Sequence, residues 1–492
     1  MPLIPINLPP GQYRNGTEYQ SQGRWRDANL IRWHEGALRP VGGWRQRGSV
    51  DISGVVRTMV AWEDNTNNRR IAFGTHDKLY AMNSGDVVSD ITPAGFTAGR
   101  VDATAFTGFG GGPYGDDLYG LPRPDTGSVL PATTWSLDNF GEYLLGCTAD
   151  DGKIYQWQLN GGTPAAVLSN APTSCSGMMV TEERFVFAFG AGGDPRKISW
   201  SDREDNNTWT AATTNEAGDI QLQTNGVILK GLRTRGQSLI LTDQDAHTAT
   251  YSGPPYVYGF ERAGTSCGLI AANAAASVDA GVIWMGQRSF FVYSGGAVQE
   301  LPCDVADYVF SDINIDQKSK VHAVVNSRFS EIWWFYPSAS STECDSYVSF
   351  DYAEQIWTTG TIDRTAGVDR GVFRQPFWIA ADGTLYEQEI GFDYGNQTPF
   401  AETGPIAIGV GEQVMSVRGM IPDENTLGDV NATFKTRFYP TDTERDYGPF
   451  SMANPTSFRL TGRQIRMRIT GDASSDWRVG IMRLDAVAGG RR

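Results

Sequence analysis

The stretch FWIAADGTLY, residues 377–386, contains the local pattern that decides the fold. It begins with an apolar run, turns through Asp382 and Gly383, and ends in a second short run that closes on Tyr386. Asp and Gly tolerate the backbone angles of tight hairpin turns, and the aromatic and β-branched residues beside them favour extended strands. The stretch therefore predicts a β-hairpin.

Six other stretches repeat this pattern of an apolar strand, a turn rich in Gly, Asp, Asn or Ser, and a strand that contains an aromatic residue. The closing aromatic residues lie 36 to 75 residues apart, and apart from the first, longest spacing they scatter around the ~40–50 residues of one propeller blade. The six stretches are RIAFGTHDKLY (70–80), YLLGCTADDGKIY (143–155), FVFAFGAGGDPRKISW (185–200), SLILTDQDAHTATY (238–251), VIWMGQRSFFVY (282–293) and IWWFYPSASSTECDSYVSF (332–350).

Hairpins cannot bury their apolar faces alone, but copies packed radially around an axis bury them and leave only short edges. We therefore predict an all-β chain in which residues 51–395 form a β-propeller of six or seven blades. A Gly-rich loop insertion at 108–128 lengthens the gap between the first two repeats, and one short helix is expected around 305–320. The alternative is a sandwich of unrelated strands.

Residues 396–492 have a different pattern, in which apolar residues alternate with polar residues or Arg. This alternation predicts strands with one buried and one wet face, and hence an additional C-terminal antiparallel β domain resembling a sandwich. Its arginines are expected to face solvent, or else a neighbouring subunit. Residues 1–50 are expected to form an N-terminal segment rich in Arg and Trp that packs on the propeller or on a neighbouring subunit.

Charge and cysteine content exclude several classes of protein. The net charge is −15, with 41 Lys and Arg against 56 Asp and Glu, which opposes non-specific binding to a phosphate backbone. The five dispersed Cys indicate buried free thiols made in a reducing cytoplasm. The residues MPLIPINLPP do not form a signal-peptide pattern, and no apolar stretch resembles a membrane span.

Patterns for catalysis, cofactors and metals are weak, so we predict none of the three. The four His share no metal-binding spacing and are expected at surface or turn positions. A match to GxGxxG at Gly110, Gly112 and Gly115 is not followed by a helix that would present amides to a phosphate. Three carboxylate groups fall at predicted turns, where solvation and turn chemistry explain them: Asp150 and Asp151; Asp202, Glu204 and Asp205; Asp243 and Asp245.

Four stretches together resemble the tail nozzle or tail-hub proteins of short-tailed bacteriophages, often called packaged-DNA stabilisation proteins. They are LPPGQYRNGTEYQSQGRWRDANLIRWHEGALRPVGGWR (8–45), GFGGGPYGDDLYG (108–120), KISWSDREDNNTW (197–209) and WRVGIMRLDAVAGGRR (477–492). The resemblance implies a virion protein that forms a ring, commonly a hexamer, at the end of a short tail. The ring would retain packaged DNA and form the channel for its ejection without binding it specifically. It would dock on an adaptor beneath the portal, with tail fibres as further partners.

Within that resemblance, two groups of residues are candidate sites. Arg and Trp are enriched at protein interfaces, so the candidate interface comprises Arg24, Trp25, Arg26, Arg32, Trp33, Arg39 and Trp44, although an intrachain core role for the Trp is an equal alternative. The candidate channel gate comprises Gly110, Gly112, Tyr114, Asp116, Asp117 and Tyr119, with a surface loop as the alternative. Part of the excess negative charge is expected to line the channel.

Two other functions stay open from the residues. The first is a glycan-binding or receptor-binding propeller that contacts the host cell surface, and the second is a polysaccharide-cleaving tail enzyme. An enzyme of the second kind needs a pair of carboxylates across one cleft. The sequence does not place any pair in this way.

Overall fold

The computed structural model describes residues 3–49, 52–106, 129–406, 413–472 and 474–490. Strands dominate these residues, and the α-helical part is one helix, α1 (Ala306–Asp312). The 3-10 helix η3 (Ile315–Lys320) follows it, and both lie in the segment where the sequence predicts a helix. Of the helices in the described ranges, none is long and apolar enough to cross a membrane.

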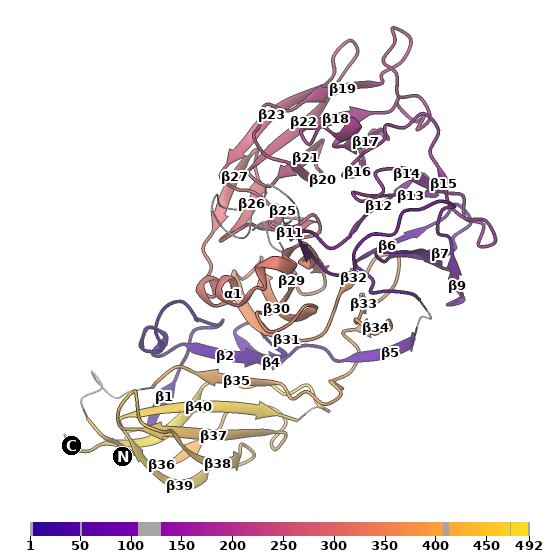
Figure 1. Cartoon of the computed structure of the whole chain (residues 1–492). Coiled ribbons are helices and arrows are strands. Elements are labelled where there is room, and N and C mark those ends of the chain that lie inside the picture. The colour runs from indigo at the N-terminus through magenta and orange to yellow at the C-terminus, as the bar shows by residue number, and fades with distance from the viewer. Residues whose placement is uncertain (1–2, 50–51, 107–128, 407–412, 473, 491–492) are drawn as a thin grey trace, which may run out of the picture.

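Seven four-stranded antiparallel sheets form the blades of a propeller (Figure 1). Blades 1 to 4 run in chain order. Blade 1 consists of β6 (Thr58–Glu63), β7 (Arg69–Gly74), β8 (Leu79–Met82) and β9 (Val88–Asp90), and blade 2 of β12 (Trp135–Phe140), β13 (Tyr143–Thr148), β14 (Ile154–Trp157) and β15 (Ala166–Val167). Blade 3 consists of β16 (Gly177–Val180), β17 (Val186–Phe189), β18 (Lys197–Trp200) and β19 (Gly218–Gln221), and blade 4 of β20 (Ile228–Thr234), β21 (Gln237–Thr242), β22 (Asp245–Gly253) and β23 (Val257–Thr265).

Blades 5 to 7 complete the circle, and the outer strand of blade 7 comes from the N-terminal part of the chain. Blade 5 consists of β24 (Ala275–Val278), β25 (Gly281–Met285), β26 (Phe290–Ser294) and β27 (Ala297–Leu301). Blade 6 consists of β28 (His322–Asn326), β29 (Glu331–Pro337), β30 (Cys344–Asp351) and β31 (Ile356–Thr361). Blade 7 consists of β32 (Ala366–Val368), β33 (Phe377–Ile379), β34 (Thr384–Gln388) and β5 (Trp44–Ser49).

The inner strands of the blades contact one another in a closed circle, from β6 through β12, β16, β20, β24 and β28 to β32 and back to β6. This closure confirms the predicted all-β class and the propeller, and it fixes the number of blades at seven. Each of the seven predicted hairpins is the middle pair of strands of one blade, and each closing aromatic residue lies on the third strand.

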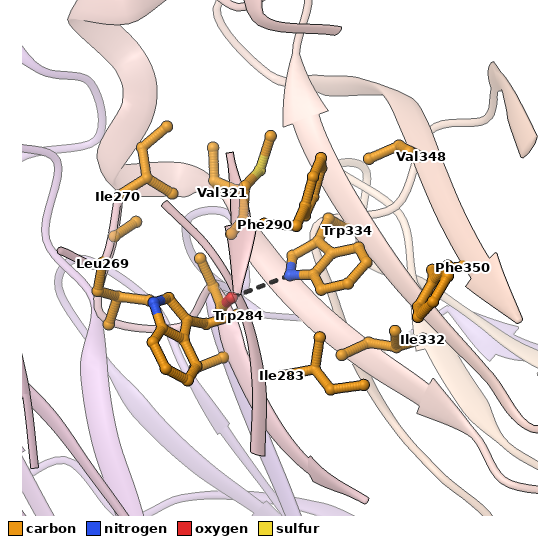
Figure 2. Close-up of a cluster of buried hydrophobic side chains, with 14 of the residues drawn as sticks. Leu269, Ile270, Ile283, Trp284, Phe290, Val321, Ile332, Trp334, Val348 and Phe350 are labelled. Carbon is orange, nitrogen blue, oxygen red and sulfur yellow. Dashed lines mark hydrogen bonds between the residues drawn. The ribbon is translucent and has the colours of Figure 1, made fainter. Parts of the chain in front are cut away.

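Large aromatic side chains fill the space between neighbouring blades. Figure 2 shows one such cluster, where Trp284 and Phe290 of blade 5 pack near Trp334 and Phe350 of blade 6. Trp334 is fully buried, and its Nε1 donates a hydrogen bond of 2.9 Å to the carbonyl oxygen of Ala274. Buried indoles are stable when this polar edge has an acceptor, so Trp334 is buried without leaving its own donor unsatisfied.

Two further antiparallel sheets form a sandwich beside the propeller, and strands from both ends of the chain take part in it. Sheet A has the order β1 (Leu3–Ile6), β41 (Met482–Ala488), β36 (Met415–Ile421) and β39 (Thr456–Gly462). Sheet B has the order β2 (Trp25–Asn29), β35 (Phe400–Thr403), β40 (Gln464–Gly471), β37 (Val430–Arg437) and β38 (Arg445–Ser451).

The remaining elements are short. A hairpin of β3 (Ile31–His34) and β4 (Ala37–Pro40) links the two units, and β10 (Thr104–Ala105) pairs with β11 (Val129–Leu130). The 3-10 helices η1 (Glu18–Ser21) and η2 (Ala191–Gly193) lie in connections. In Figure 1 the violet strands β2, β4 and β5 run along the boundary between the sandwich and the propeller, whereas β1 lies within the sandwich.

Candidate functional site

Residues 3–49, which we call the N-terminal clasp, tie the two units together. β1 pairs with β41, and β2 pairs with β35, so the clasp supplies one edge strand to each sheet of the sandwich. β5 pairs with β34 and closes blade 7. A propeller closed by a strand from the far end of the sequence cannot open between its first and last blades without breaking that ladder. The clasp therefore holds the propeller closed and ties it to the sandwich.

Arg32 lies in β3, at the centre of a buried ionic cluster. Its Nε and Nη2 donate to the carboxylate of Glu331 at 2.8 and 2.7 Å, and its Nη2 and Nη1 donate to that of Glu389 at 2.6 and 3.0 Å. The guanidinium also lies 3.6 Å from the ring centroid of Phe329. Because Glu331 begins β29 and Glu389 follows β34, this one side chain joins blade 6 to blade 7.

Burial sets the ionisation of this cluster. Desolvation opposes the charged forms, but the two carboxylates raise the pKa of Arg32 above its ordinary value. The pKa of Glu331 is raised, because desolvation outweighs the attraction of Arg32. Desolvation acts on Glu389 as well, but Arg32, Asn326 and the amide of Gly42 favour its ionised form and lower its pKa. The side chain of Arg32 therefore stays charged, and the cluster offers no free group for proton transfer.

The other arginines of the candidate interface have partners within the chain. Arg24 pairs with Asp304 at 2.9 Å, directly before α1, and Arg39 pairs with Asp476 of the sandwich at 2.9 Å. Arg26 is held weakly, since its Nη1 donates to the carbonyl oxygen of Thr17 at 3.4 Å, and burial lowers its pKa. These three side chains are only partly buried.

The three tryptophans stabilise the clasp from inside. Trp25 and Trp33 are buried in the core of the sandwich, with their ring centroids 6.0 Å apart. Trp44, on β5, is half-buried and has the guanidinium of Arg364 4.9 Å from its ring. Since Trp25, Trp33 and Arg32 are buried within one chain, they have little surface for a second subunit. A subunit interface stays a prediction for Arg24, Arg26, Arg39 and Trp44.

The candidate gate lies outside the described residues. Gly110, Gly112, Tyr114, Asp116, Asp117 and Tyr119 all fall in 107–128. Near the described ends of that range, Ala103 exchanges two hydrogen bonds with the side-chain amide of Gln317, at 2.9 and 3.1 Å. Lys320, which is fully buried, binds Asp102 and Glu343. The connection between blades 1 and 2 is thus fixed to η3 of the blade 5–6 connection.

The three carboxylate groups singled out from the sequence lie on three different blades. Asp151 accepts a hydrogen bond from the hydroxyl of Tyr155, Asp202 accepts the amide of Glu216 at 2.8 Å, and Asp245 accepts the hydroxyl of Thr242 at 2.6 Å. Each of these interactions stabilises a local turn or loop of its own blade. The structure does not bring the groups together across one cleft.

Two of the four histidines contradict the expectation of surface or turn positions. His247 lies in β22 and His322 in β28, and both are buried. His322 stacks on Phe335, and burial lowers its pKa to about 4. The error arose because an isolated His among apolar residues gives no sign of burial. In the described parts of the chain, no group of three His, Cys, Asp or Glu has the geometry to hold a metal.

The cysteines are free, as the dispersed spacing predicts. Burial raises the pKa of their thiols, for example that of Cys267 to about 11. Cys303 is only partly buried, unlike the other four, because it lies in the connection that precedes α1. A thiol with a raised pKa is a poor nucleophile, which fits packing rather than chemistry.

A cavity that the sequence did not predict opens at one end of the propeller axis. Its volume is about 810 Å³, and turns between the first two strands of several blades line it. Charged side chains of both signs surround it, namely Glu182, Arg233, Arg235, Asp279 and Asp369. These residues lie in or beside turns of four different blades, so only the circular arrangement of the blades brings them together.

Charge is strongly segregated between the two units. Residues 50–395 contain 22 Lys and Arg against 42 Asp and Glu, a net charge of −20. Residues 396–492 contain 12 Lys and Arg against 11 Asp and Glu, and residues 1–49 contain 7 against 3. The propeller therefore carries all of the excess negative charge, and the clasp and sandwich are slightly basic.

No family model matches the chain, and no curated protein matches it either. Among solved structures, virginiamycin B lyase from Staphylococcus aureus is 8% identical with a TM-score of 0.41, and the match covers 70% of this chain and 98% of that chain. The WD40 β-propeller domain of Doa1 is 10% identical with a TM-score of 0.40, covering 70% and 96%. The WD40 domain of Neurospora crassa Pan2 is 9% identical with a TM-score of 0.39, covering 70% and 94%.

Proposed function

We propose that this chain is a structural virion protein whose copies form the ring-shaped nozzle of a short phage tail. The ring closes the end of the tail, retains the packaged DNA and forms the channel for its ejection. It is a homo-oligomer, a hexamer as the sequence resemblance implies, which assembles in the host cytoplasm and remains in the virion. The role is mechanical and involves no chemical step.

The observation that carries this proposal is the charge distribution on a closed propeller. A surface that neutralises phosphates gains affinity from each released counterion, so a basic wall would hold DNA in place. The propeller instead carries a net charge of −20. Copies that turn part of this surface towards a shared axis repel the strand and leave it free to move.

The clasp supports the same role. It closes blade 7 with β5 and joins the sandwich to the propeller through β1, β2 and the Arg32 cluster, so each subunit is a stiff body. A wall that DNA passes must keep its shape, and the buried links meet that need. The proposed partners are further copies of this chain, the tail adaptor, tail fibres, and genomic DNA that passes without specific binding.

A native mass measurement on the purified chain tests the proposal. At a salt concentration of about 0.15 M, we expect a closed oligomer, and we expect a DNA duplex to leave its mass and mobility unchanged. A chain that stays monomeric at every concentration, or one that binds duplex DNA tightly at this salt, would count against the nozzle.

A second candidate is a receptor-binding propeller, favoured by one groove on the outside of blades 2 and 3. Its volume is about 420 Å³, and the described residues that line it have no ionisable side chain. Amide and hydroxyl groups suit a neutral sugar, which offers many weak donors and acceptors. Binding on a glycan array, lost on substitution of the groove, tests this role. The polar lining residues are Gln156, Gln158, Asn160, Thr163, Ser169 and Asn207.

A further inference from the structure

A ring of more than two identical copies requires two different surfaces on each chain that fit each other. The nozzle proposed above therefore implies a pair of complementary surfaces, and the inference that follows rests on that proposed function. Opposite charge is one form of complementarity, because it steers association and rejects a contact between like surfaces. The propeller is strongly acidic and the clasp and sandwich are slightly basic, so the two units are the candidates for such a pair.

The acidic member of the pair is the propeller, which carries the net charge of −20. Several of its carboxylates are exposed and lie in loops, on outer strands or at the end of an inner strand. Examples from four different blades are Glu63, Glu204, Glu261 and Glu300. Exposed carboxylates are therefore available to a positively charged partner surface around much of the propeller.

The basic member is the outer face of sheet A, which points away from sheet B. On β41 the apolar residues Met482, Leu484 and Ala486 point into the sandwich core, so Arg483 between them points outward and is exposed. On β39, Leu460 points inward and Arg459 is exposed on the opposite face.

The strand between these two contributes a third arginine to the same face. β36 lies between β41 and β39, and Arg418 is exposed at the bulge between Val417 and Gly419. One acid, Asp485, shares the face, so these four side chains sum to +2. Across the described residues, no carboxylate lies within ion-pair distance of Arg459 or Arg483.

Apolar side chains complete the face. On the edge strand β1, Leu3 pairs in register with Asp485 and is 41% exposed, and Pro5 pairs with Arg483. A flat sheet with exposed arginines beside apolar groups has the composition of a protein interface, where Arg is enriched and Lys is depleted. None of the three basic positions on this face is a lysine.

We propose that the outer face of sheet A packs against the acidic propeller of the next copy in the ring. The contact is heterologous, with the sandwich of one chain against the propeller of its neighbour, so its repetition generates a ring when the rotation closes. Arg459 and Arg483 supply the charge that selects the partner surface, and the apolar groups beside them supply burial.

The test compares two double variants that change net charge equally. Arg459→Glu with Arg483→Glu reverses the proposed face, whereas Arg235→Glu with Arg288→Glu reverses two exposed arginines of the propeller. Oligomer mass is measured by native mass spectrometry over a range of protein concentrations, and thermal unfolding checks that both variants remain folded. Parallel samples at low and high salt measure the electrostatic part.

We expect the sheet A variant to raise the concentration of half-assembly about tenfold or more, a change that corresponds to 1.4 kcal/mol or more. The propeller variant should assemble like the unmodified chain, and salt should weaken assembly of the unmodified chain. Equal effects of both variants, or assembly that neither variant changes, would overturn the inference while leaving the nozzle itself intact.

A DNA duplex provides the remaining comparison. If the unmodified chain binds the duplex and only the sheet A variant loses that binding, the face is a polyanion site and the subunit contact is refuted. If the unmodified chain forms no oligomer at all, the proposed nozzle fails together with the inference. Failure of the interface alone is therefore distinguishable from failure of the function on which it rests.

Discussion

Replacing Arg32 with Met should destabilise the protein strongly, because two carboxylates would remain buried without a cation. The side chains of Arg32, Glu331 and Glu389 are only 3%, 6% and 7% exposed. Met keeps much of the length of Arg and its apolar contacts, so the change removes charge and hydrogen bonds more than volume. The ion cluster joins β3 to blades 6 and 7, and all three would loosen together.

The size of the effect follows from burial. Removing one partner of a buried ion pair costs about 3–5 kcal/mol, because the remaining charge is left uncompensated. Four hydrogen bonds from Arg32 disappear at once. Loss of the cation–π contact between Arg32 and the Phe329 ring adds about 0.5–2 kcal/mol to this cost. We therefore expect a loss at or above the upper end of the range for one buried pair.

Chemical unfolding at pH 7, followed by near-ultraviolet circular dichroism, measures this loss. The triple variant Arg32→Met with Glu331→Gln and Glu389→Gln is the matched control, since it removes the cation and both anions. It should recover at least half of the lost stability. The deficit of the single variant should also shrink at acidic pH, where the stranded carboxyls protonate. A single variant as stable as the unmodified chain would refute the buried-charge reasoning.

Three further predictions use other parts of the structure. Burial lowers the pKa of His322 from 6.5 to about 4, so its stabilising contribution is complete above pH 6.5 and is lost as the pH falls to 4, about 3 kcal/mol in all. The free energies of unfolding of the unmodified chain and of His322→Phe should therefore diverge by this amount between pH 6.5 and pH 4. Parallel curves of unfolding free energy against pH would contradict the prediction. Gly404→Ala places a Cβ 2.2 Å from the carbonyl oxygen of Ser21 and should lower the free energy of unfolding by about 1–3 kcal/mol. The control Gly48→Ala, whose added Cβ meets nothing within 4 Å, should be close to neutral when both variants are melted under the same conditions. A chain that lacks residues 1–49 should give no cooperative unfolding transition, because it loses β1, β2 and β5; a cooperative transition of normal height would show that the clasp is dispensable.

The hairpins of the propeller could be predicted because their information is local. A stretch such as FWIAADGTLY contains both of its strands and its turn within ten neighbouring residues, and its pairing needs no distant partner. The number of blades was less certain, because the outer strand of blade 7 comes from residues 44–49. No local pattern marks a strand whose partner lies more than three hundred residues away.

The role of the Arg and Trp stretch was only partly predictable, for a related reason. Composition identifies Trp25 and Arg32 as anchors, but an anchor of the core and an anchor of a subunit contact look alike in one dimension. Burial separates them, and burial here depends on Glu331, Glu389 and β35, all distant in sequence. The buried histidines were mispredicted because an isolated His gives no local sign of burial, although the ring that His322 stacks on, Phe335, lies on the neighbouring strand of the same blade.

An averaged electron-microscope image of the purified assembly tests the central claim most directly. The claim is that several copies of this seven-bladed subunit surround one open passage that DNA can traverse. The account predicts a ring of identical lobes with an unobstructed centre, each lobe large enough for one propeller and one sandwich. A population of single particles without rotational symmetry, or a symmetric cluster with a filled centre, would contradict it.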